Sequence, residues 1–298
     1  MSQPAPAARD GVSVRLPSPL QEVADERLAR AGVRLSLKRD DLISRELPGN
    51  KWRKLKYNLD AARRQGHDVL LTFGGAYSNH IRATAAAGRA FGFSTVGVIR
   101  GEEHLPLNPS LSYAAGQGMR LAYLDRTTYR AKAEPDVVAA LRDRFGDFYL
   151  IPEGGSNGLA ARGCAEIPAE IGRPFDVMCC PCGTGGTLAG IAAGLGDGQR
   201  ALGFSVLKGG QFLTGTVAGV QTEAFGAGSG NWAIDDRFHF GGFARRHADL
   251  DRFIADFRER HGLALDWVYV AKMMYGLYAC AGEGSFAPGT RIVALITG

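Results

Sequence analysis

The stretch VMCCPCGTGGTLAGIAAGLG at residues 177–196 decides the fold. It is uncharged and about long enough to span a bilayer, but Pro181 and the many glycines and threonines interrupt it. An apolar run, then glycines, then a second apolar pattern predicts a strand, a loop and a helix. This unit is typical of α/β proteins, and we expect no membrane association.

The same alternation of short apolar runs and helical patterns extends through most of the chain, and it predicts parallel sheets covered by helices. Strands are expected at residues 35–38, 69–73, 94–99, 120–124, 148–151, 177–180, 201–206 and 292–296. Helices are expected at residues 20–31, 52–65, 79–91, 137–145, 188–195 and 250–261.

Composition and charge exclude several classes of protein. Of the 298 residues, 45% are hydrophobic and 22% are charged, which is typical of a globular protein and excludes a disordered or fibrous chain. The net charge of +5 is spread without a long basic run, so we expect no nucleic-acid partner. The N-terminus has no apolar signal-peptide core, and Cys179, Cys180 and Cys182 lack the spacing of a zinc site. We therefore expect a cytoplasmic protein with reduced thiols and no bound metal.

Glycine is unusually frequent, with 41 residues, and three glycine-rich junctions account for part of the excess. They follow predicted strands at residues 74–75, 154–158 and 183–187. In open α/β sheets, ligands bind at the carboxyl ends of the strands, and glycine lets the backbone approach a bound anion closely. The junctions therefore predict a ligand site.

The third junction, PCGTGGTLAG, has the features of a phosphate cup. Its free backbone N–H groups and the positive end of a helix dipole would face an anion, and Thr184 and Thr187 add hydroxyl donors. It is not a Walker A loop, because no Gly-Lys-Ser/Thr follows, and Leu188 replaces the third glycine of the dinucleotide fingerprint. A tight strand-to-helix turn is the alternative interpretation.

A second candidate is Lys51, which follows the turn residues Pro48, Gly49 and Asn50 and begins an amphipathic pattern. A lysine at such a position can be partly desolvated, which lowers its pKa toward that of a nucleophilic amine, as Schiff-base chemistry requires. Taken by itself, the pattern leaves open that Lys51 is a solvated surface lysine.

Seven motifs carry a resemblance to a known family. They read GNKWRKLKYNL, FGGAYSNHIRATAAAGRAFG, EGGSNGLAARG, CGTGGTLAGIAAG, FHFGGFA, LDWVYVAKMMYGL and LITG. In this order, over nearly the whole chain, they resemble the 1-aminocyclopropane-1-carboxylate deaminases and D-cysteine desulfhydrases, which are pyridoxal-phosphate enzymes of fold type II.

The resemblance implies a tryptophan synthase β-like fold of the α/β class, with two open, twisted, mostly parallel sheets covered by helices. Residues 1–50 and 160–298 would form a large domain and residues 51–159 a small one, with pyridoxal 5'-phosphate between them. It also implies a homodimer that acts on a small amino acid.

Matched residue by residue, the resemblance assigns the cofactor to Lys51, as its Schiff-base lysine, and to Lys54, at its phosphate. Asn79 would donate to the ring hydroxyl, and Thr297 would bond the pyridine nitrogen. The other phosphate contacts would come from the cup residues Gly183, Thr184, Gly185, Gly186 and Thr187.

The residues that the resemblance places at the substrate are Ser78, Asn79, His80, Phe243 and Tyr269. Ser78 would bind the substrate carboxylate or act on the substrate, and a helix N-cap is compatible with that role. His80 matches the desulfhydrases, where deaminases tend to have glutamine; a helix-surface histidine is the alternative. Lys51, Ser78 and Tyr269 would be the catalytic residues.

Two departures from the family pattern bear on the reaction. Val270 stands where a ring-opening deaminase needs a carboxylate, and Phe243 stands where a tyrosine is common. The best specific expectation is therefore β-elimination of D-cysteine to pyruvate, ammonia and hydrogen sulfide. Racemisation, β-replacement, a biosynthetic step on an unusual amino acid and noncatalytic cofactor binding are the alternatives.

Overall fold

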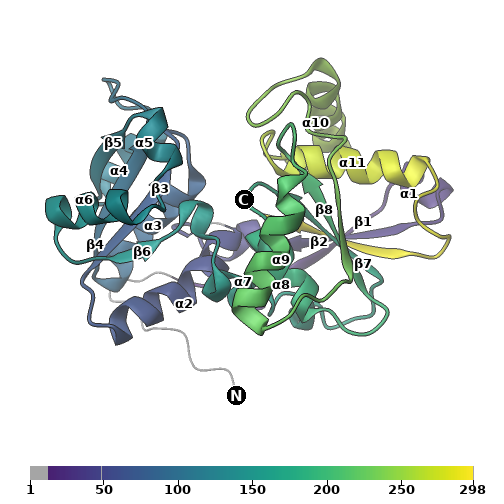
Figure 1. Cartoon of the computed structure of the whole chain (residues 1–298). Coiled ribbons are helices and arrows are strands. Elements are labelled where there is room, and N and C mark those ends of the chain that lie inside the picture. The colour runs from purple at the N-terminus through teal and green to yellow at the C-terminus, as the bar shows by residue number, and fades with distance from the viewer. Residues whose placement is uncertain (1–12, 48, 298) are drawn as a thin grey trace.

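The computed structural model describes residues 13–47 and 49–297, which form two sheets with helices on both faces of each (Figure 1). Two predictions lie outside the described residues: the absence of a signal peptide at residues 1–12, and the place of Pro48 in the turn before Lys51. The strands are β1 (Leu20–Val23), β2 (Arg34–Arg39), β3 (Val69–Gly74), β4 (Ser94–Arg100), β5 (Arg120–Leu124), β6 (Tyr149–Ile151), β7 (Val177–Cys182), β8 (Arg200–Ser205), β9 (Trp232–Asp235) and β10 (Arg291–Ile296).

The α-helices are α1 (Glu26–Arg30), α2 (Asn50–Arg64), α3 (Asn79–Phe91), α4 (Pro109–Gly116), α5 (Arg126–Arg130), α6 (Pro135–Phe145), α7 (Gly158–Cys164), α8 (Gly186–Gly194), α9 (Phe212–Phe225), α10 (Ala248–His261) and α11 (Val270–Gly282). Short 3-10 turns occur at Asp40–Leu42, Glu153–Gly155 and Pro168–Ile171.

The larger sheet has the strand order β1-β2-β10-β7-β8-β9, and all its neighbouring strands are parallel except β1 with β2. The smaller sheet has the order β5-β4-β3-β6 and is parallel throughout. Parallel neighbours need long crossover connections, which the helices supply. The architecture confirms the predicted α/β class with two mostly parallel sheets.

Strand β7 separates two cores of the larger sheet, because alternate side chains of a strand point to opposite faces. Val177 and Cys179 pack with α1, α10 and α11, whereas Met178, Cys180 and Cys182 pack with α7, α8 and α9. Burial raises the pKa of the Cys179 thiol, which therefore stays protonated. The clustered cysteines are thus core residues, and the described residues contain no cluster of potential metal ligands.

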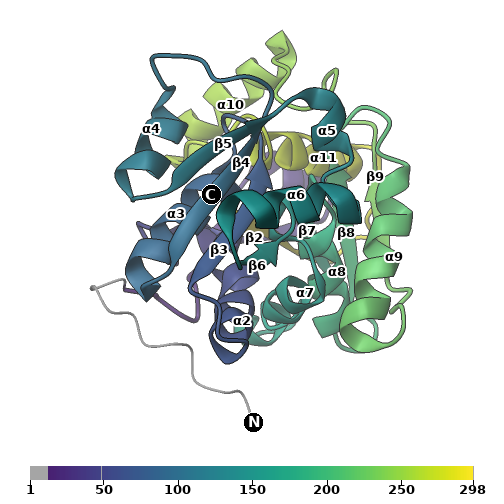
Figure 2. The same ribbon diagram turned by 60° about the vertical axis from the view of Figure 1, so that its left-hand side comes forward.

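The smaller sheet lies entirely within residues 51–159. Leu70 packs toward α2 and α3, whereas the next residue, Leu71, packs toward α5 and α6 on the opposite face (Figure 2). Helix α2 precedes β3, the first strand of this sheet, and packs against α7. Helix α7 in turn packs against α8, which covers one face of the larger sheet. The domain boundaries at residues 51 and 159 stay a prediction.

One element was predicted wrongly. Residues 20–31 do not form a single helix, because β1 pairs antiparallel with β2 and α1 begins only at Glu26. The Asp25 carboxylate accepts a 2.9 Å hydrogen bond from the backbone N–H of Arg27 and so caps the helix. The backbone N–H and C=O groups of residues 20–23 pair with β2, whereas in a helix they would bond within the same segment.

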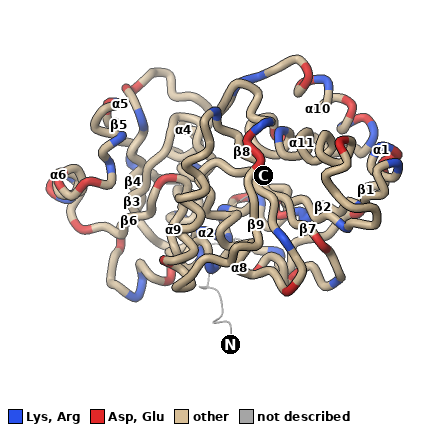
Figure 3. The backbone as a smooth tube through the Cα atoms, turned by 45° about the vertical axis from the view of Figure 1, so that its right-hand side comes forward, with Lys and Arg blue, Asp and Glu red and all other residues tan. Residues whose placement is uncertain are grey.

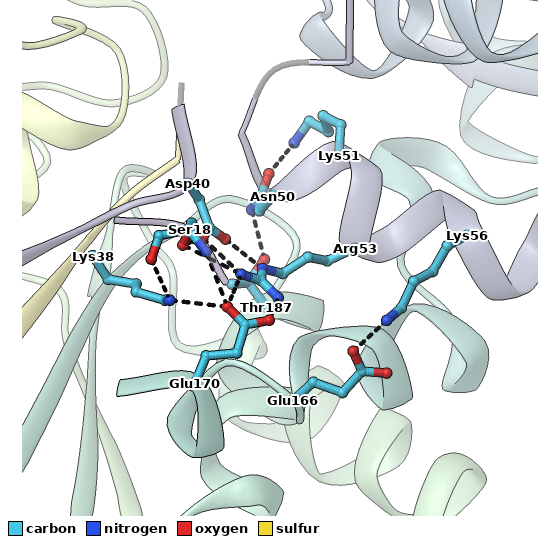
Figure 4. A network of polar contacts seen from close by, with 10 residues as sticks. All are labelled: Ser18, Lys38, Asp40, Asn50, Lys51, Arg53, Lys56, Glu166, Glu170 and Thr187. Atoms are coloured by element: carbon cyan, nitrogen blue, oxygen red, sulfur yellow. Dashed lines mark hydrogen bonds and ion pairs between the residues drawn. The ribbon is translucent and has the colours of Figure 1, made fainter. Parts of the chain in front are cut away.

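A buried ionic network ties α2 to the larger sheet (Figure 4). Arg53 donates to both carboxylate oxygens of Asp40 at 2.6 and 2.9 Å, and to both of Glu170 at 2.7 and 2.9 Å. Lys38 donates to Glu170 at 2.9 Å and to the carbonyl of Ser18 at 2.8 Å. The side chains of Arg53, Asp40 and Lys38 have no exposed area. The ion pairs that hold α2 are therefore shielded from water.

Most of the other charges are interspersed along the chain, without a block of one sign (Figure 3). No helix among the described residues is long and apolar enough to cross a membrane.

Candidate active site

Lys51 lies in the first turn of α2, which follows the N-cap residue Gly49 with its φ of 67°. Its Nζ donates to Asn50 Oδ1 at 3.2 Å, and its half-buried side chain points away from the Arg53 network (Figure 4). Burial, followed by the positive charge of Lys54, lowers the pKa of Lys51 to about 7. A substantial fraction of the amine is therefore neutral at physiological pH, as a nucleophile requires.

The predicted phosphate cup is the junction between β7 and α8. Gly185 has a φ of 76°, and a Cβ there would lie 2.8 Å from the Val217 side chain. At Gly186, a Cβ would lie 2.7 Å from Ser156 Oγ. Both positions therefore require glycine, because neighbouring side chains occupy the space of a Cβ. The N–H groups at the start of α8 belong to the first turn, which has no partners within the helix, and such groups can bind an anion.

Hydroxyl groups and α2 surround this cup. Asn50 Nδ2 donates to the Oγ1 of the buried Thr187 at 2.8 Å, which joins the start of α2 to the start of α8. Ser156 Oγ and Thr184 Oγ1 lie 2.5 Å apart. Asn50 and Ser156 were not predicted as site residues, although both lie in the quoted motifs.

Lys54 supplies a second cation to the same place. Its Nζ donates to the carbonyl of Gly154 and to Ser156 Oγ, each at 3.0 Å. Burial lowers the pKa of Lys54, and among the described residues neither Lys51 nor Lys54 forms an ion pair with a carboxylate. Two lysines without anionic partners beside a glycine-lined cup favour an anionic ligand.

Tyr269 covers the other side of the cup. A Cβ at Gly183 would lie 3.1 Å from Tyr269 Cε1, so the tyrosine ring occupies the space that only glycine leaves. Its ring meets Phe243 edge to face, with centroids 5.7 Å apart, and Phe243 is 48% exposed. Burial, and then the charges of Asp266 and Glu153, raises the pKa of Tyr269, so its phenol is protonated at neutral pH.

Lys272, one turn further along α11, holds the loop that carries Phe243. Its Nζ donates to the carbonyls of His239 and Gly242 at 2.9 and 2.7 Å, and its side chain is buried. Burial lowers the pKa of Lys272 to about 8. The lysine of the YVAK motif is therefore a tether between the two segments, a role that the motif itself did not reveal.

The predicted residues of α3 differ in their surroundings. Ser78 is the N-cap, and its Oγ accepts from the N–H of Ile81 at 3.3 Å; Asn79 is exposed. Within the described part of the chain, no hydrogen bond or ion pair joins these two side chains to Lys51 or the cup. His80 is buried rather than on the helix surface, and its ring lies against Gly155, where a Cβ would come within 2.9 Å of its Cε1.

The tautomer of His80 follows from its neighbour Thr72. The Thr72 hydroxyl donates to the carbonyl of Ile151 at 2.8 Å, so it accepts from His80 Nε2, also at 2.8 Å. His80 Nδ1 is left as a buried acceptor without a partner among the described residues. Burial, and then the charges of Lys51 and Lys54, keeps the pKa of His80 far below its usual value, so the ring is neutral.

Thr297, predicted at the cofactor ring, follows β10 and is buried. Its carbonyl accepts from the N–H of Asn50 at 3.3 Å, so the end of the larger sheet adjoins the start of α2. A network of contacts thus brings Lys51, Lys54, the cup, Tyr269, Phe243, His80 and Thr297 into one region of the molecule.

These groups fit an aldehyde that carries a phosphate. Lys51 is an amine of lowered pKa for the carbonyl, and Lys54 and the cup match the phosphate. The orphaned acceptor His80 Nδ1 leaves a hydrogen bond that a ligand can complete.

Comparison with known proteins agrees with this chemistry. A family model described as pyridoxal-phosphate dependent enzyme matches residues 15–298. The mitochondrial bifunctional D-cysteine desulfhydrase/1-aminocyclopropane-1-carboxylate deaminase of Arabidopsis thaliana is 30% identical, over 83% of this chain and 67% of that protein. The D-cysteine desulfhydrase of Yersinia pestis is 28% identical, over 90% of this chain and 87% of that protein.

Among solved structures, that of an ACC deaminase homologue superposes with a TM-score of 0.85 at 27% identity, covering 96% of this chain and 90% of the other. A threonine deaminase of Solanum lycopersicum, with a TM-score of 0.68 at 18% identity, shares the fold. The predicted cofactor, pyridoxal phosphate, and the predicted class of enzyme are confirmed. The chain therefore belongs to the pyridoxal-phosphate-dependent enzymes, within the family of the 1-aminocyclopropane-1-carboxylate deaminases and D-cysteine desulfhydrases.

Proposed function

We propose that this chain is a lyase that converts D-cysteine and water to pyruvate, ammonia and hydrogen sulfide. The observation that carries the proposal is the meeting, at one site, of the Lys51 amine with a pKa of about 7 and a glycine-lined anion cup. Val270 supports elimination over cyclopropane ring opening. Its side chain is apolar and buried at the position where the family resemblance places the carboxylate of the ring-opening deaminases.

In this proposal, Lys51 binds the cofactor covalently, the cup and Lys54 bind its phosphate, and Asn79 and Thr297 contact its ring. When bound, pyridoxal phosphate supplies an electron sink for the negative charge that develops on the substrate α-carbon. Ser78, at the N-terminus of α3, binds the substrate carboxylate, where the helix dipole favours a negative charge.

The protein's own groups divide the proton transfers between them. Once the substrate amine has displaced Lys51 from the cofactor, the freed Lys51 would be the base that removes the α-proton, because an amine with a pKa of about 7 is available in its neutral form at physiological pH. Tyr269 acts as a hydrogen-bond donor on the substrate side, because burial and nearby carboxylates keep its phenol protonated. As the bond between Cβ and sulfur breaks, hydrosulfide would leave and take up the proton that Lys51 holds, which gives hydrogen sulfide. Water hydrolyses the remaining three-carbon enamine to pyruvate and ammonia.

A panel of four amino acids tests the reaction. Incubated with D-cysteine, L-cysteine, D-serine and 1-aminocyclopropane-1-carboxylate, the enzyme should release pyruvate and sulfide fastest from D-cysteine. Formation of 2-oxobutyrate from the cyclopropane compound would instead identify a deaminase. If none of the four yields an oxoacid, elimination from these amino acids is excluded. The exposed Phe243, which lacks a tyrosine hydroxyl, would then favour racemisation or β-replacement.

We expect Lys54→Gln to weaken binding of pyridoxal phosphate by about 10- to 100-fold, because a charge-assisted hydrogen bond contributes about 1.5–3 kcal/mol. Glutamine keeps N–H donors near Gly154 and Ser156 but removes the charge. Absorbance titration of cofactor-free protein measures the change in Kd. An unchanged Kd would mean that Lys54 does not face the phosphate.

Homodimerisation, which the family resemblance supports, and a cytoplasmic location, which the free cysteines support, are further parts of the proposal. Sedimentation of the purified protein measures the first of them directly.

A further inference from the structure

Asp266 organises the backbone at the beginning of α11. One carboxylate oxygen accepts from the N–H of Val268 at 3.0 Å, and the other accepts from Tyr269 at 2.8 Å and Val270 at 3.0 Å. The Asp266 carbonyl also accepts from the N–H of Ala271 at 2.8 Å. One residue therefore satisfies four backbone donors, two just before α11 and two in its first turn, where a helix has no partners of its own for such groups.

These bonds determine where the ring of Tyr269 lies. Tyr269 has φ and ψ of −119° and −70°, outside the regular helix, and its own side chain makes no capping bond. Its ring rests over Gly183 of the cup and against Phe243, so a shift of the Tyr269 backbone would move the wall of the site. The Asp266 carboxylate restrains this backbone, because it accepts hydrogen bonds from the N–H groups of Tyr269 and Val270.

The charge of Asp266 also acts on the site. Burial is the largest influence on the pKa of Lys51 and lowers it, but Asp266 opposes this by favouring the protonated amine. Burial raises the pKa of Tyr269, and Asp266 raises it further by disfavouring the phenolate. One carboxylate therefore acts on both Lys51, the assigned base, and Tyr269, the assigned hydrogen-bond donor.

We propose that Asp266 is a positioning residue of this active site, which holds the Tyr269 ring over the cup through backbone hydrogen bonds and supplies a negative charge that acts on Lys51. The inference deepens the proposed function and rests on it, because it concerns the same site. Asp266 itself has no contact with the cup among the described residues, so its effect passes through Tyr269 and through space.

Other charged and titratable groups face the same two residues. Lys54 on α2 lowers the pKa of Lys51, and Cys164 on α7 raises it, ahead of Asp266. Glu153, after β6, raises the pKa of Tyr269. The buried His80 on α3 stays neutral and carries no charge toward Lys51. Among these charged groups, Asp266 is the one that raises the pKa of both Lys51 and Tyr269.

Two substitutions separate the two roles. Asp266→Asn keeps a side-chain oxygen that caps helices well but removes the charge, whereas Asp266→Ala removes both. Asp125→Asn is the matched control, because Asp125 caps α5 through the N–H groups of Thr127 and Thr128 and contacts no site residue. Thermal unfolding of all three variants identifies any that fail to fold.

The first readout is the rate at which cofactor-free protein recombines with pyridoxal phosphate, measured against pH. This rate follows the neutral amine of Lys51, so we expect its midpoint to shift to lower pH in both Asp266 variants and to stay unchanged in Asp125→Asn. The second readout is the visible circular dichroism of the bound cofactor. We expect it to be kept in Asp266→Asn and reduced in Asp266→Ala, because the Tyr269 wall is displaced only in the latter.

An unshifted midpoint in Asp266→Asn would overturn the charge effect, and equal circular dichroism in the two Asp266 variants would overturn the positioning role. Neither readout depends on which amino acid is turned over. If the wild-type protein binds pyridoxal phosphate but does not eliminate D-cysteine, the proposed reaction fails while the inference about Asp266 is still decided.

Discussion

Replacing Lys51 with alanine should abolish the visible absorbance of the lysine-bound cofactor and lower turnover of D-cysteine by about 1,000-fold or more. The substitution removes both the amine that binds the cofactor and the base assigned to the α-proton. Absorbance spectra before and after addition of pyridoxal phosphate measure the first effect, and pyruvate release measures the second. In the wild-type protein, cofactor attachment should accelerate as pH rises through about 7, because the neutral form of Lys51 is the nucleophile.

Lys56→Gln is the control for this experiment. Lys56 lies on the same helix, but its Nζ pairs with Glu166 rather than with the site. The control should keep the visible band and most of the activity. A visible band that persisted in Lys51→Ala, or was missing from the wild-type protein after addition of cofactor, would show that Lys51 is not the attachment residue.

Replacing Arg53 with methionine should lower the free energy of unfolding by about 3–5 kcal/mol, because it leaves buried carboxylates without their main cation. Arg53 bonds both Asp40 and Glu170 in a bidentate manner, and its side chain has no exposed area. Methionine retains much of the side-chain volume, so the loss measures the unpaired charges more than a cavity. Urea denaturation followed by fluorescence gives the free energy.

The matched control is Arg142→Met, which breaks an exposed pair with Asp147. Their side chains are 47% and 67% exposed, so the cost should stay below about 1 kcal/mol. If Arg53→Met cost no more than this control, the network would not be what holds α2 in place.

The same network gives a pH signature. Burial raises the pKa of Glu170, but hydrogen bonds and charge from Arg53, with those of Lys38, outweigh it and lower the pKa from 4.5 to about 2. A carboxyl with a lowered folded-state pKa stabilises the protein fully above pH 4.5 and loses this contribution as pH falls toward 2. Arg53→Met should therefore lose part of the dependence of stability on pH in this interval.

Local patterns in the sequence predicted most of the sheet and the most distinctive part of the site. Continuous apolar runs marked strands such as β3, β4, β7 and β8, because strands buried on both faces need apolar side chains throughout. The GTGGT junction was recognised because glycine spacing between a strand and a helix is a short-range property. The wrong helix at residues 20–31 shows the limit, since an edge strand and a short helix together resemble one amphipathic helix.

Residues whose roles depend on distant partners could not be found in this way. Lys54, which the family resemblance assigned and no local pattern did, meets Ser156 across 102 positions of the chain, and Asn50 meets Thr187 across 137. Asp266 and Lys272 lie in a quoted motif, but nothing local indicates that one caps α11 and the other tethers the Phe243 loop.

The sequence by itself determined the class of fold, and it predicted the phosphate cup and the reactive lysine, because these follow from periodicity, glycine spacing and family motifs. Only the tertiary structure decided that the Lys51 amine has a pKa of about 7, that His80 is a neutral acceptor and that Asp266 acts on both Lys51 and Tyr269. The physical reason is that desolvation and Coulomb interactions depend on which groups fold together in space, and a linear pattern does not encode those distances.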